Sequence, residues 1–308
     1  MSSQFTRREL LSSMTACWLA STAWPRAKPK WIDNMGVELY TVRSLLTEKA
    51  LETIEAVAAI GYRHSEIQDV MTLARLAPIL KDVGLTPTSA HFTPAFLTGN
   101  WEFPAQFGID KPADGYDIDA VIEDAHRHEL EYLVFPMVYP EERGGLDVYR
   151  SLAGELNRVG EKCRQANVAL CYHNHNFEFE PIEGSTPFAV LAAEMDRRYV
   201  NFELDVFWAD HAGVDPVKLM RTYSGRTPLL HLKDLRAATP DSYKVLGTWR
   251  NDPGAFEELG DGVIDFASVL HAASEHGVVH CYVEQDHTPG DPVASLRKSY
   301  EHLRALDL

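Results

Sequence analysis

The chain has 308 residues, of which 45% are hydrophobic and 24% charged, and its formal net charge is −16 at pH 7. This length and composition are typical of one large α/β domain with a substantial core. The acidic charge argues against nucleic acid as a partner, since phosphate backbones are bound by cationic surfaces. The four cysteines show no C-x-x-C spacing, so we expect those after residue 30 to be reduced and buried.

The first 30 residues have the composition of an export signal. T-R-R-E-L-L at residues 6–11 precedes an apolar segment that ends at Ala23 and a linker with Pro, Lys and Arg. This order is typical of a twin-arginine signal. We therefore expect an export signal and linker over residues 1–30, a catalytic domain over residues 31–308, and a periplasmic or otherwise exported protein. M-T-A-C at residues 14–17 is similar to a lipoprotein cleavage site, so a lipid anchor on Cys17 is an alternative. No later segment approaches the ~20 apolar residues of a membrane span.

Strand-like and helix-like segments alternate along the rest of the chain. The expected strands cover residues 35–40, 63–67, 86–91, 132–136, 168–172, 200–205, 229–232 and 278–284. The expected helices cover residues 49–60, 71–83, 118–128, 146–167, 187–195, 216–222, 266–276 and 293–305. Between the third strand and its helix, residues 92–116 form a long aromatic segment that we expect to be a lid or a pocket wall.

Eight strand–helix pairs at intervals of about 30 residues predict an α/β fold with a single (β/α)8 TIM barrel. A doubly wound open sheet is the alternative. It is disfavoured because no Gly-rich phosphate-binding motif follows the first strand.

Metal-ligand side chains stand at the ends of four expected strands. The fifth strand runs into H-N-H, with His173 and His175, and the next three end in Asp205, His231 and Glu284. A TIM barrel gathers the C-terminal ends of its strands around one mouth. Four such groups would repel or desolvate one another without a cation. The sequence therefore predicts one divalent cation held by His173, Asp205, His231 and Glu284.

Further polar and aromatic side chains fall at the same mouth. The candidates for substrate binding are Tyr40, Arg43, Glu66, His91 and Trp208. Aromatic side chains at strand ends also serve as ordinary packing, which is the alternative for Tyr40 and Trp208. Lys233 follows His231 by two residues and hence shares its face, where it could polarise a substrate oxygen. A salt bridge from Lys233 to Asp234 or Asp286 is the alternative.

A series of motifs runs through residues 35–306 in a fixed order: G-V-E-L-Y-T-V-R, G-Y-R-H-S-E, S-A-H-F, Y-H-N-H-N-F-E-F-E-P, E-L-D-V-F-W, H-L-K-D, L-G-D-G-V-I-D-F and Y-V-E-Q-D. These motifs resemble those of the sugar phosphate isomerase/epimerase family, the xylose isomerase-like TIM barrels. In that family a Glu, an Asp, a His and a second Glu on strands five to eight hold one metal, and these positions fall on His173, Asp205, His231 and Glu284. Where many relatives read E-N-H this chain reads H-N-H, so His173 replaces a carboxylate that doubles as a base in epimerases of the family.

The resemblance implies a metal-dependent enzyme that removes a proton next to the carbonyl of a keto-sugar and stabilises the resulting enediolate. Isomerisation or epimerisation is the leading expectation. β-Elimination from a 3-keto-glycoside or keto-inositol is the alternative, which the lost glutamate and an exported location favour. A non-catalytic carbohydrate-binding barrel is the third reading, and the acidic charge disfavours a metal-dependent nuclease.

Roles for individual residues follow from the same resemblance. We expect Glu284 to be the base, His175 its partner acid or an alternate base, and Lys233 an electrostatic support. The expected cofactor is one Mn²⁺, with Mg²⁺, Co²⁺ or Zn²⁺ as alternatives, and the expected ligand is a small sugar or keto-glycoside. The sequence leaves open whether the chain forms an oligomer.

Overall fold

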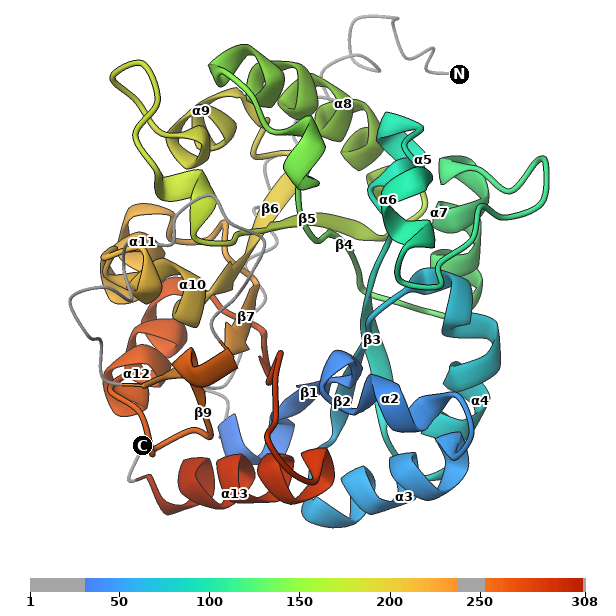
Figure 1. The fold of residues 1–308 in the computed structure, drawn as a ribbon, viewed down its shortest axis with the longest axis vertical. Helices are drawn as coiled ribbons and strands as arrows, with labels where there is room; N and C mark the ends of the chain where they lie inside the picture. The colour runs from blue at the N-terminus through green and yellow to red at the C-terminus, as the bar shows by residue number, and fades with distance from the viewer. Residues whose placement is uncertain (1–30, 237–252, 307–308) are drawn as a thin grey trace, which may run out of the picture.

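A computed structural model describes residues 31–236 and 253–306. Eight parallel strands close into a barrel in the order β1-β10-β7-β6-β5-β4-β3-β2 (Figure 1). The strands of the barrel are β1 (Gly36–Glu38), β2 (His64–Ile67), β3 (Thr86–His91), β4 (Tyr132–Phe135), β5 (Ala169–His173), β6 (Val200–Asp205), β7 (Leu229–Leu232) and β10 (His280–Val283). The expected TIM barrel is confirmed. The expected export signal, with Cys17, lies outside the described residues.

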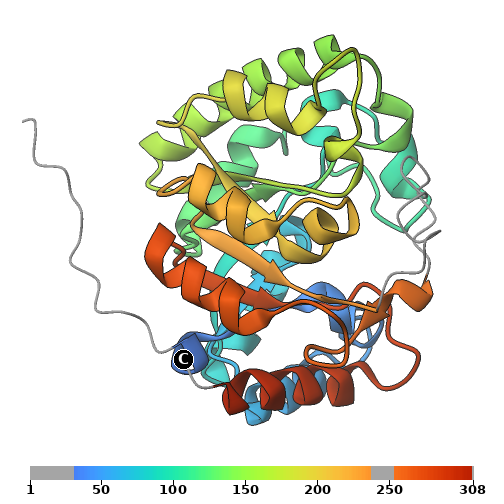
Figure 2. The same ribbon diagram turned by 90° about the vertical axis from the view of Figure 1, so that its left-hand side faces the viewer.

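A ring of helices covers the outside of the barrel (Figure 1). Its long members are α3 (Ala50–Ile60), α4 (Leu73–Asp82), α7 (Ile118–Arg127), α8 (Leu146–Gln165), α9 (Pro187–Glu194), α11 (Pro216–Thr222), α12 (Phe266–His276) and α13 (Pro292–Ala305). The first of these, α3, packs against the last, α13, so the two ends of the chain close the ring together (Figure 2). Aspartates precede α7, α11, α12 and α13 and accept backbone N–H groups of the first turn, which is the usual way for a helix start to be capped.

Shorter elements occupy the connections. They are α2 (Arg43–Leu46), α5 (Ala95–Thr98), α6 (Glu102–Ala105), α10 (Val206–His211), the two-stranded pair β8 (Asp234–Leu235) and β9 (Phe256–Glu257), and 3₁₀ turns at Trp31–Asn34, Leu39–Val42, Val70–Thr72, Pro140–Glu142, Phe177–Phe179 and Pro253–Ala255. The expected lid segment, residues 92–116, contains α5 and α6, and these pack through Ala95 and Phe103 against Tyr139 after β4.

The barrel strands are buried on both faces, as expected for a parallel sheet covered by helices. The lower part of the barrel interior is filled by Tyr132, Val134, Cys171, Leu229 and Tyr282. Gly36 on β1 is required there, because a Cβ at this position would overlap the Tyr282 ring.

The structure bears on the expectations for the cysteines and for membrane-spanning segments. Cys163, Cys171 and Cys281 are buried and unpaired, as expected. Among the described residues no helix is both long and apolar enough to cross a membrane.

Candidate metal centre and active site

The structure brings the four expected metal ligands together at the C-terminal mouth of the barrel. His173, Asp205 and His231 come from β5, β6 and β7, and Glu284 follows β10 directly. His231 Nδ1 lies 2.6 Å from Glu284 Oε2 and 3.9 Å from Asp205 Oδ2. His173 Nε2 lies 3.8 Å from the same Asp205 oxygen. Side chains that are remote along the chain therefore face one common space.

This donor set fits a divalent cation. One ligand atom each from Asp205, His231 and Glu284 lies within 4.8 Å of the others. Asp205 Oδ2 is buried and lies 3.0 Å from Lys233 Nζ, in addition to the two imidazoles. Buried carboxylates that converge with imidazoles in this way are stabilised by a cation between them. Two carboxylates and two imidazoles are ligands that Mn²⁺, Zn²⁺ and related ions accept.

Local structure holds Asp205 in this position. Its Oδ1 accepts the backbone N–H of Trp208 at 2.8 Å and caps α10, which leaves Oδ2 to face the other ligands. The side chain of Asn174 accepts the Asp205 N–H at 3.0 Å and donates to the Asp205 carbonyl at 3.3 Å. The middle residue of H-N-H thus ties the end of β5 to the end of β6.

Lys233 lies among three carboxylates and is 2% exposed. Its Nζ is 2.7 Å from Asp286, 2.8 Å from Glu284 and 3.0 Å from Asp205. Burial lowers the pKa of Lys233, but these carboxylates raise it well above its ordinary value, so the side chain is an ammonium. Asp234, the other partner considered, instead accepts backbone N–H groups of β8 and of residues 260, 262 and 264.

The pKa values of the three carboxylates around Lys233 are shifted in different directions. Burial alone would raise the pKa of Glu284, but Lys233 and His231 hold that pKa below its ordinary value and keep Glu284 ionised. Burial raises the pKa of Asp205 despite the nearby Lys233. Burial also raises the pKa of Asp286 to about 6, although Lys233 acts in the opposite direction.

His175 lies beside the metal ligands. Its ring is 5.0 Å from that of His173 and 5.3 Å from that of Trp208, between centroids. Burial, and then the charge of Lys233, lower the pKa of His175 well below its ordinary value, so the ring is neutral at pH 7. Its backbone N–H donates to Glu178 at 2.9 Å.

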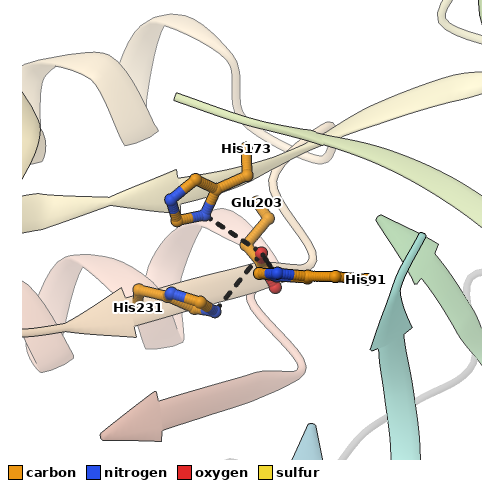
Figure 3. A group of neighbouring side chains, drawn as sticks. All are labelled: His91, His173, Glu203 and His231. Carbon is orange, nitrogen blue, oxygen red and sulfur yellow. Dashed lines mark hydrogen bonds and ion pairs between the residues drawn. The ribbon is translucent and has the colours of Figure 1, made fainter. Parts of the chain in front are cut away.

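A second layer of ionisable side chains lies beneath the four ligands. Glu203 Oε2 is 3.1 Å from His173 Nδ1, 3.2 Å from His91 Nε2 and 3.3 Å from His231 Nε2 (Figure 3). Glu66 Oε1 is 2.6 Å from His231 Nε2 and 3.0 Å from His91 Nε2. Glu203 was not among the expected site residues, although it stands two residues before Asp205 on one strand and therefore shares its face.

Two of the expected ligands, His173 and Glu284, border a cavity of about 150 Å³, whereas Asp205 and His231 do not line it. Of the candidate residues, Tyr40, His91, His173, His175, Lys233 and Glu284 line it. Arg143, Met137 and Asp286 also line it, and none of the three was among the expected site residues. Arg143 and Met137 follow β4, whose end carries no histidine or carboxylate that would have predicted a site there.

The remaining three candidates for substrate binding do not line the cavity. The Arg43 guanidinium stacks 3.7 Å from the Tyr40 ring centroid, donates to the Asp286 carbonyl at 3.0 Å, and borders a second cavity of about 330 Å³. Trp208 is 2% exposed and packs with Phe207 and Phe256. Glu66 is fully buried in the layer below the ligands. These positions favour support of the site over direct contact with a substrate.

Comparison with known proteins agrees with this fold. Residues 52–306 match the profile of the xylose isomerase-like TIM barrel family. An inosose dehydratase of Lacticaseibacillus casei is 26% identical over 273 residues, which cover 82% of this chain and 88% of that one. A crystal structure of a sugar phosphate isomerase/epimerase from Parabacteroides distasonis superimposes with a TM-score of 0.70 at 22% identity, over 92% of this chain and 96% of that one. The IOLI protein, solved with a zinc atom, has a TM-score of 0.63 at 14% identity, over 89% and 100% of the two chains.

Proposed function

The chain belongs to the xylose isomerase-like TIM barrel family, and on that premise we propose that it is a divalent-metal-dependent enzyme that removes a proton next to the carbonyl of a keto-sugar or keto-cyclitol. The observation that carries the proposal is the convergence of His173, Asp205, His231 and Glu284. Of these, His173 and Glu284 line a cavity together with Lys233 and His175. An inosose dehydratase among the relatives supports a polyhydroxylated ketone as the substrate class.

The cation would be held by the four converging side chains. When bound, it would withdraw electron density from the carbonyl oxygen of the substrate and so acidify the neighbouring C–H bond. Mn²⁺ remains our expected ion, because the set mixes oxygen and nitrogen ligands.

The chain's own residues would carry the proton transfers. Glu284 borders the cavity, and Lys233 keeps it ionised, so its carboxylate can accept the proton from carbon. Lys233 holds a fixed positive charge beside the oxygen on which negative charge develops. His175 borders the same cavity and would donate a hydrogen bond to an oxygen substituent that departs.

We propose elimination as the outcome. After the proton moves to Glu284, the electron pair of the broken C–H bond forms a C=C bond, and the C–O bond of the β-substituent breaks. The departing oxygen takes up the proton that Glu284 removed from carbon and leaves as water or an alcohol, so Glu284 is again a carboxylate and the product is an α,β-unsaturated ketone. On β5 the imidazole of His173 stands between Glu203 and Asp205 in place of a free carboxylate. Elimination requires no second base there, whereas epimerisation does.

Isomerisation or epimerisation, the leading expectation from the sequence, is the second candidate. Its support is the structural similarity to a sugar phosphate isomerase/epimerase. Export of the chain, which we propose from residues 1–30, would place the enzyme among keto-glycosides rather than sugar phosphates and so favours elimination.

Incubation of the protein with a candidate substrate and Mn²⁺ in D₂O distinguishes elimination from isomerisation or epimerisation. We expect a 3-keto-glycoside or a keto-inositol to lose its β-substituent and to gain the ultraviolet absorbance of a conjugated ketone. Deuterium incorporation without loss of a substituent would instead establish isomerisation or epimerisation. A substrate that binds but keeps every C–H bond would contradict both enzymatic reactions. It would instead support a non-catalytic carbohydrate-binding barrel.

A further inference from the structure

A second cavity lies at the same face of the barrel as the catalytic cavity. Its volume is about 330 Å³, against about 150 Å³ for the catalytic cavity beside His173 and Glu284. Its lining residues fall within 43–47, 68–76 and 107–109, segments that follow β1, β2 and β3. In a TIM barrel the segments after the strands form the face at which substrates bind. The second cavity is therefore part of that face, although the proton transfers proposed above do not use it.

The two cavities are neighbours. Tyr40 lines the catalytic cavity, and Arg43 lines the second. The Arg43 guanidinium lies 3.7 Å from the Tyr40 ring centroid and donates at 3.0 Å to the carbonyl of Asp286, which also lines the catalytic cavity. This stacked pair is the partition between the cavities. Tyr40 is 37% exposed, so a ligand can pass over the partition on its solvent side and occupy both cavities.

Polar groups in the second cavity suit a ligand with hydroxyl groups. Gln68 Oε1 is buried and has no hydrogen-bond partner among the described residues. Arg75 donates one N–H, at 3.0 Å, to the carbonyl of Leu46, and a guanidinium carries five such donors. A hydroxyl both donates and accepts hydrogen bonds. An amide oxygen and guanidinium N–H groups in one cavity can therefore satisfy a hydroxylated ligand.

Phe107 gives the same cavity an apolar wall. Its side chain is 58% exposed, and its ring lies 5.3 Å from that of Phe103 between centroids. Binding sites for small molecules combine such apolar surface with a few polar groups. The faces of a sugar ring carry C–H groups that can cover an aromatic ring, while its hydroxyl groups reach the polar wall. Asp69 also lines the cavity and offsets part of the charge of Arg43 and Arg75, which favours a neutral ligand over an anion.

We propose that the second cavity binds the leaving group of the substrate, and that this leaving group is a second sugar ring. The inference rests on the proposed function and selects a 3-keto-disaccharide over a keto-inositol. Pockets that enclose a small molecule commonly measure about 300–1,000 Å³, so the smaller catalytic cavity suits the keto-sugar ring alone. The second ring then lies beyond the Tyr40–Arg43 partition, between Phe107 and the polar wall.

The elimination divides the substrate at this partition. Glu284 takes the proton from C2 of the keto-sugar, the C1=C2 bond forms, and the glycosidic C1–O bond breaks. The glycosidic oxygen takes up the same proton, and the second sugar leaves the second cavity as an alcohol. The unsaturated ketone remains in the catalytic cavity.

Two substrates of the same anomeric configuration test the inference. A methyl 3-keto-glucoside fills the catalytic cavity alone, whereas a 3-keto-disaccharide reaches both cavities. With Mn²⁺-loaded protein, the absorbance of the conjugated ketone gives kcat and KM for each substrate. We expect kcat/KM to be about tenfold higher or more for the disaccharide, since each such contact with a ring is worth roughly a factor of ten. Both anomeric configurations are measured.

Two variants locate the second ring, and a third serves as the matched control. Phe107→Ala and Gln68→Leu should each raise KM for the disaccharide about tenfold with little change in kcat, because they remove binding that is made equally in the ground state and the transition state. Either variant should affect the methyl glucoside far less. Leu51→Ala removes a side chain of α3 that is also exposed, at 53%, and should change neither substrate. Equal loss on both substrates in the two variants would overturn the subsite.

Failure of the subsite and failure of the proposed function give different results. Conversion of both substrates with equal kcat/KM would overturn the subsite and leave the function standing. If neither substrate reacts, the function fails, and calorimetric titration with the same two compounds decides the subsite. Tighter binding of the disaccharide that is lost in Phe107→Ala would support the subsite, and equal affinities would overturn it.

Discussion

Asp205 shows how one side chain serves both fold and site. Its Oδ1 caps α10 while its Oδ2 faces His173 and His231. Asn caps a helix as well as Asp does, whereas Ala does not. The two functions of Asp205 can therefore be separated by substitution.

Asp205→Asn and Asp205→Ala should both weaken the binding of the cation, by a factor on the order of 100 or more, and both should abolish activity. Only Asp205→Ala should also lower the free energy of unfolding of the metal-free protein, by about 1 kcal/mol through loss of the cap. Metal titration and denaturant unfolding measure the two effects. Full activity of either variant without added metal would disprove the metal site.

Glu284 has two expected roles, ligand and base. Its carboxylate contacts His231 and Lys233 and borders the cavity. In Glu284→Gln the amide oxygen can still contact a cation but cannot take a proton, so we expect activity to fall much further than metal affinity. The turnover number and the metal dissociation constant are measured on the same preparation. Equal losses would make Glu284 a ligand only.

At the scale of elements, the ends of the strands were readable from the sequence, because the strand–helix alternation defines where parallel strands end. His173, Asp205, His231 and Glu284 accordingly lie at one mouth. In the layer beneath them, Glu66 and His91 were predicted as substrate contacts, whereas Glu203 was not predicted because it lies two residues before the end of its strand, on the same face as Asp205.

Helix α10 explains a second difference. It begins directly after β6 and was not expected, since the predicted strand ends at residue 205 and the next predicted helix begins at residue 216. The helix directs Trp208 into packing with Phe207 and Phe256, so tertiary contacts that a single sequence does not reveal decide its place. Arg43 likewise stacks on the Tyr40 ring and donates to the Asp286 carbonyl, and these tertiary contacts could not be predicted from the sequence either.

The turn after β5 gives a pH-dependent prediction. Glu178 is fully buried, accepts from Tyr172 and from the backbone of His175, and burial raises its pKa to about 7 from the ordinary value of 4.5. The folded state therefore binds more protons than the unfolded state between these values, and stability falls as pH rises through that window. Glu178→Gln cannot titrate. Between pH 4 and pH 8 we expect the unfolding free energy of the unaltered protein to fall by up to about 3 kcal/mol relative to the variant. A difference that stays constant with pH would contradict a raised pKa at Glu178.

At the scale of the whole molecule, the eight strand–helix pairs of the sequence predicted the barrel correctly. Its closure places β10 beside β1. Six carboxyl groups meet inside this closed wall, so the fold concentrates acidic side chains whose charge is offset by Lys233, by bound protons or by a cation. The expected export signal stays a prediction, because it lies outside the described residues.

Removal of the cation should destabilise the barrel. A ligand that binds only the folded state at 100 times its dissociation constant adds about 2.7 kcal/mol, and for a chain of this size we expect chelation to lower the melting temperature by about 5–10 °C. Asp205→Asn should show a much smaller response to the chelator. Differential scanning calorimetry with and without Mn²⁺ measures the shift, and an equal response in that variant would place the stabilising ion elsewhere.

The most direct measurement is an anomalous difference map from crystals grown with Mn²⁺. We predict a peak between His173, Asp205, His231 and Glu284 at the mouth of the barrel. A well-ordered mouth with no peak there, or with these four side chains turned toward different partners, would contradict the shared metal site.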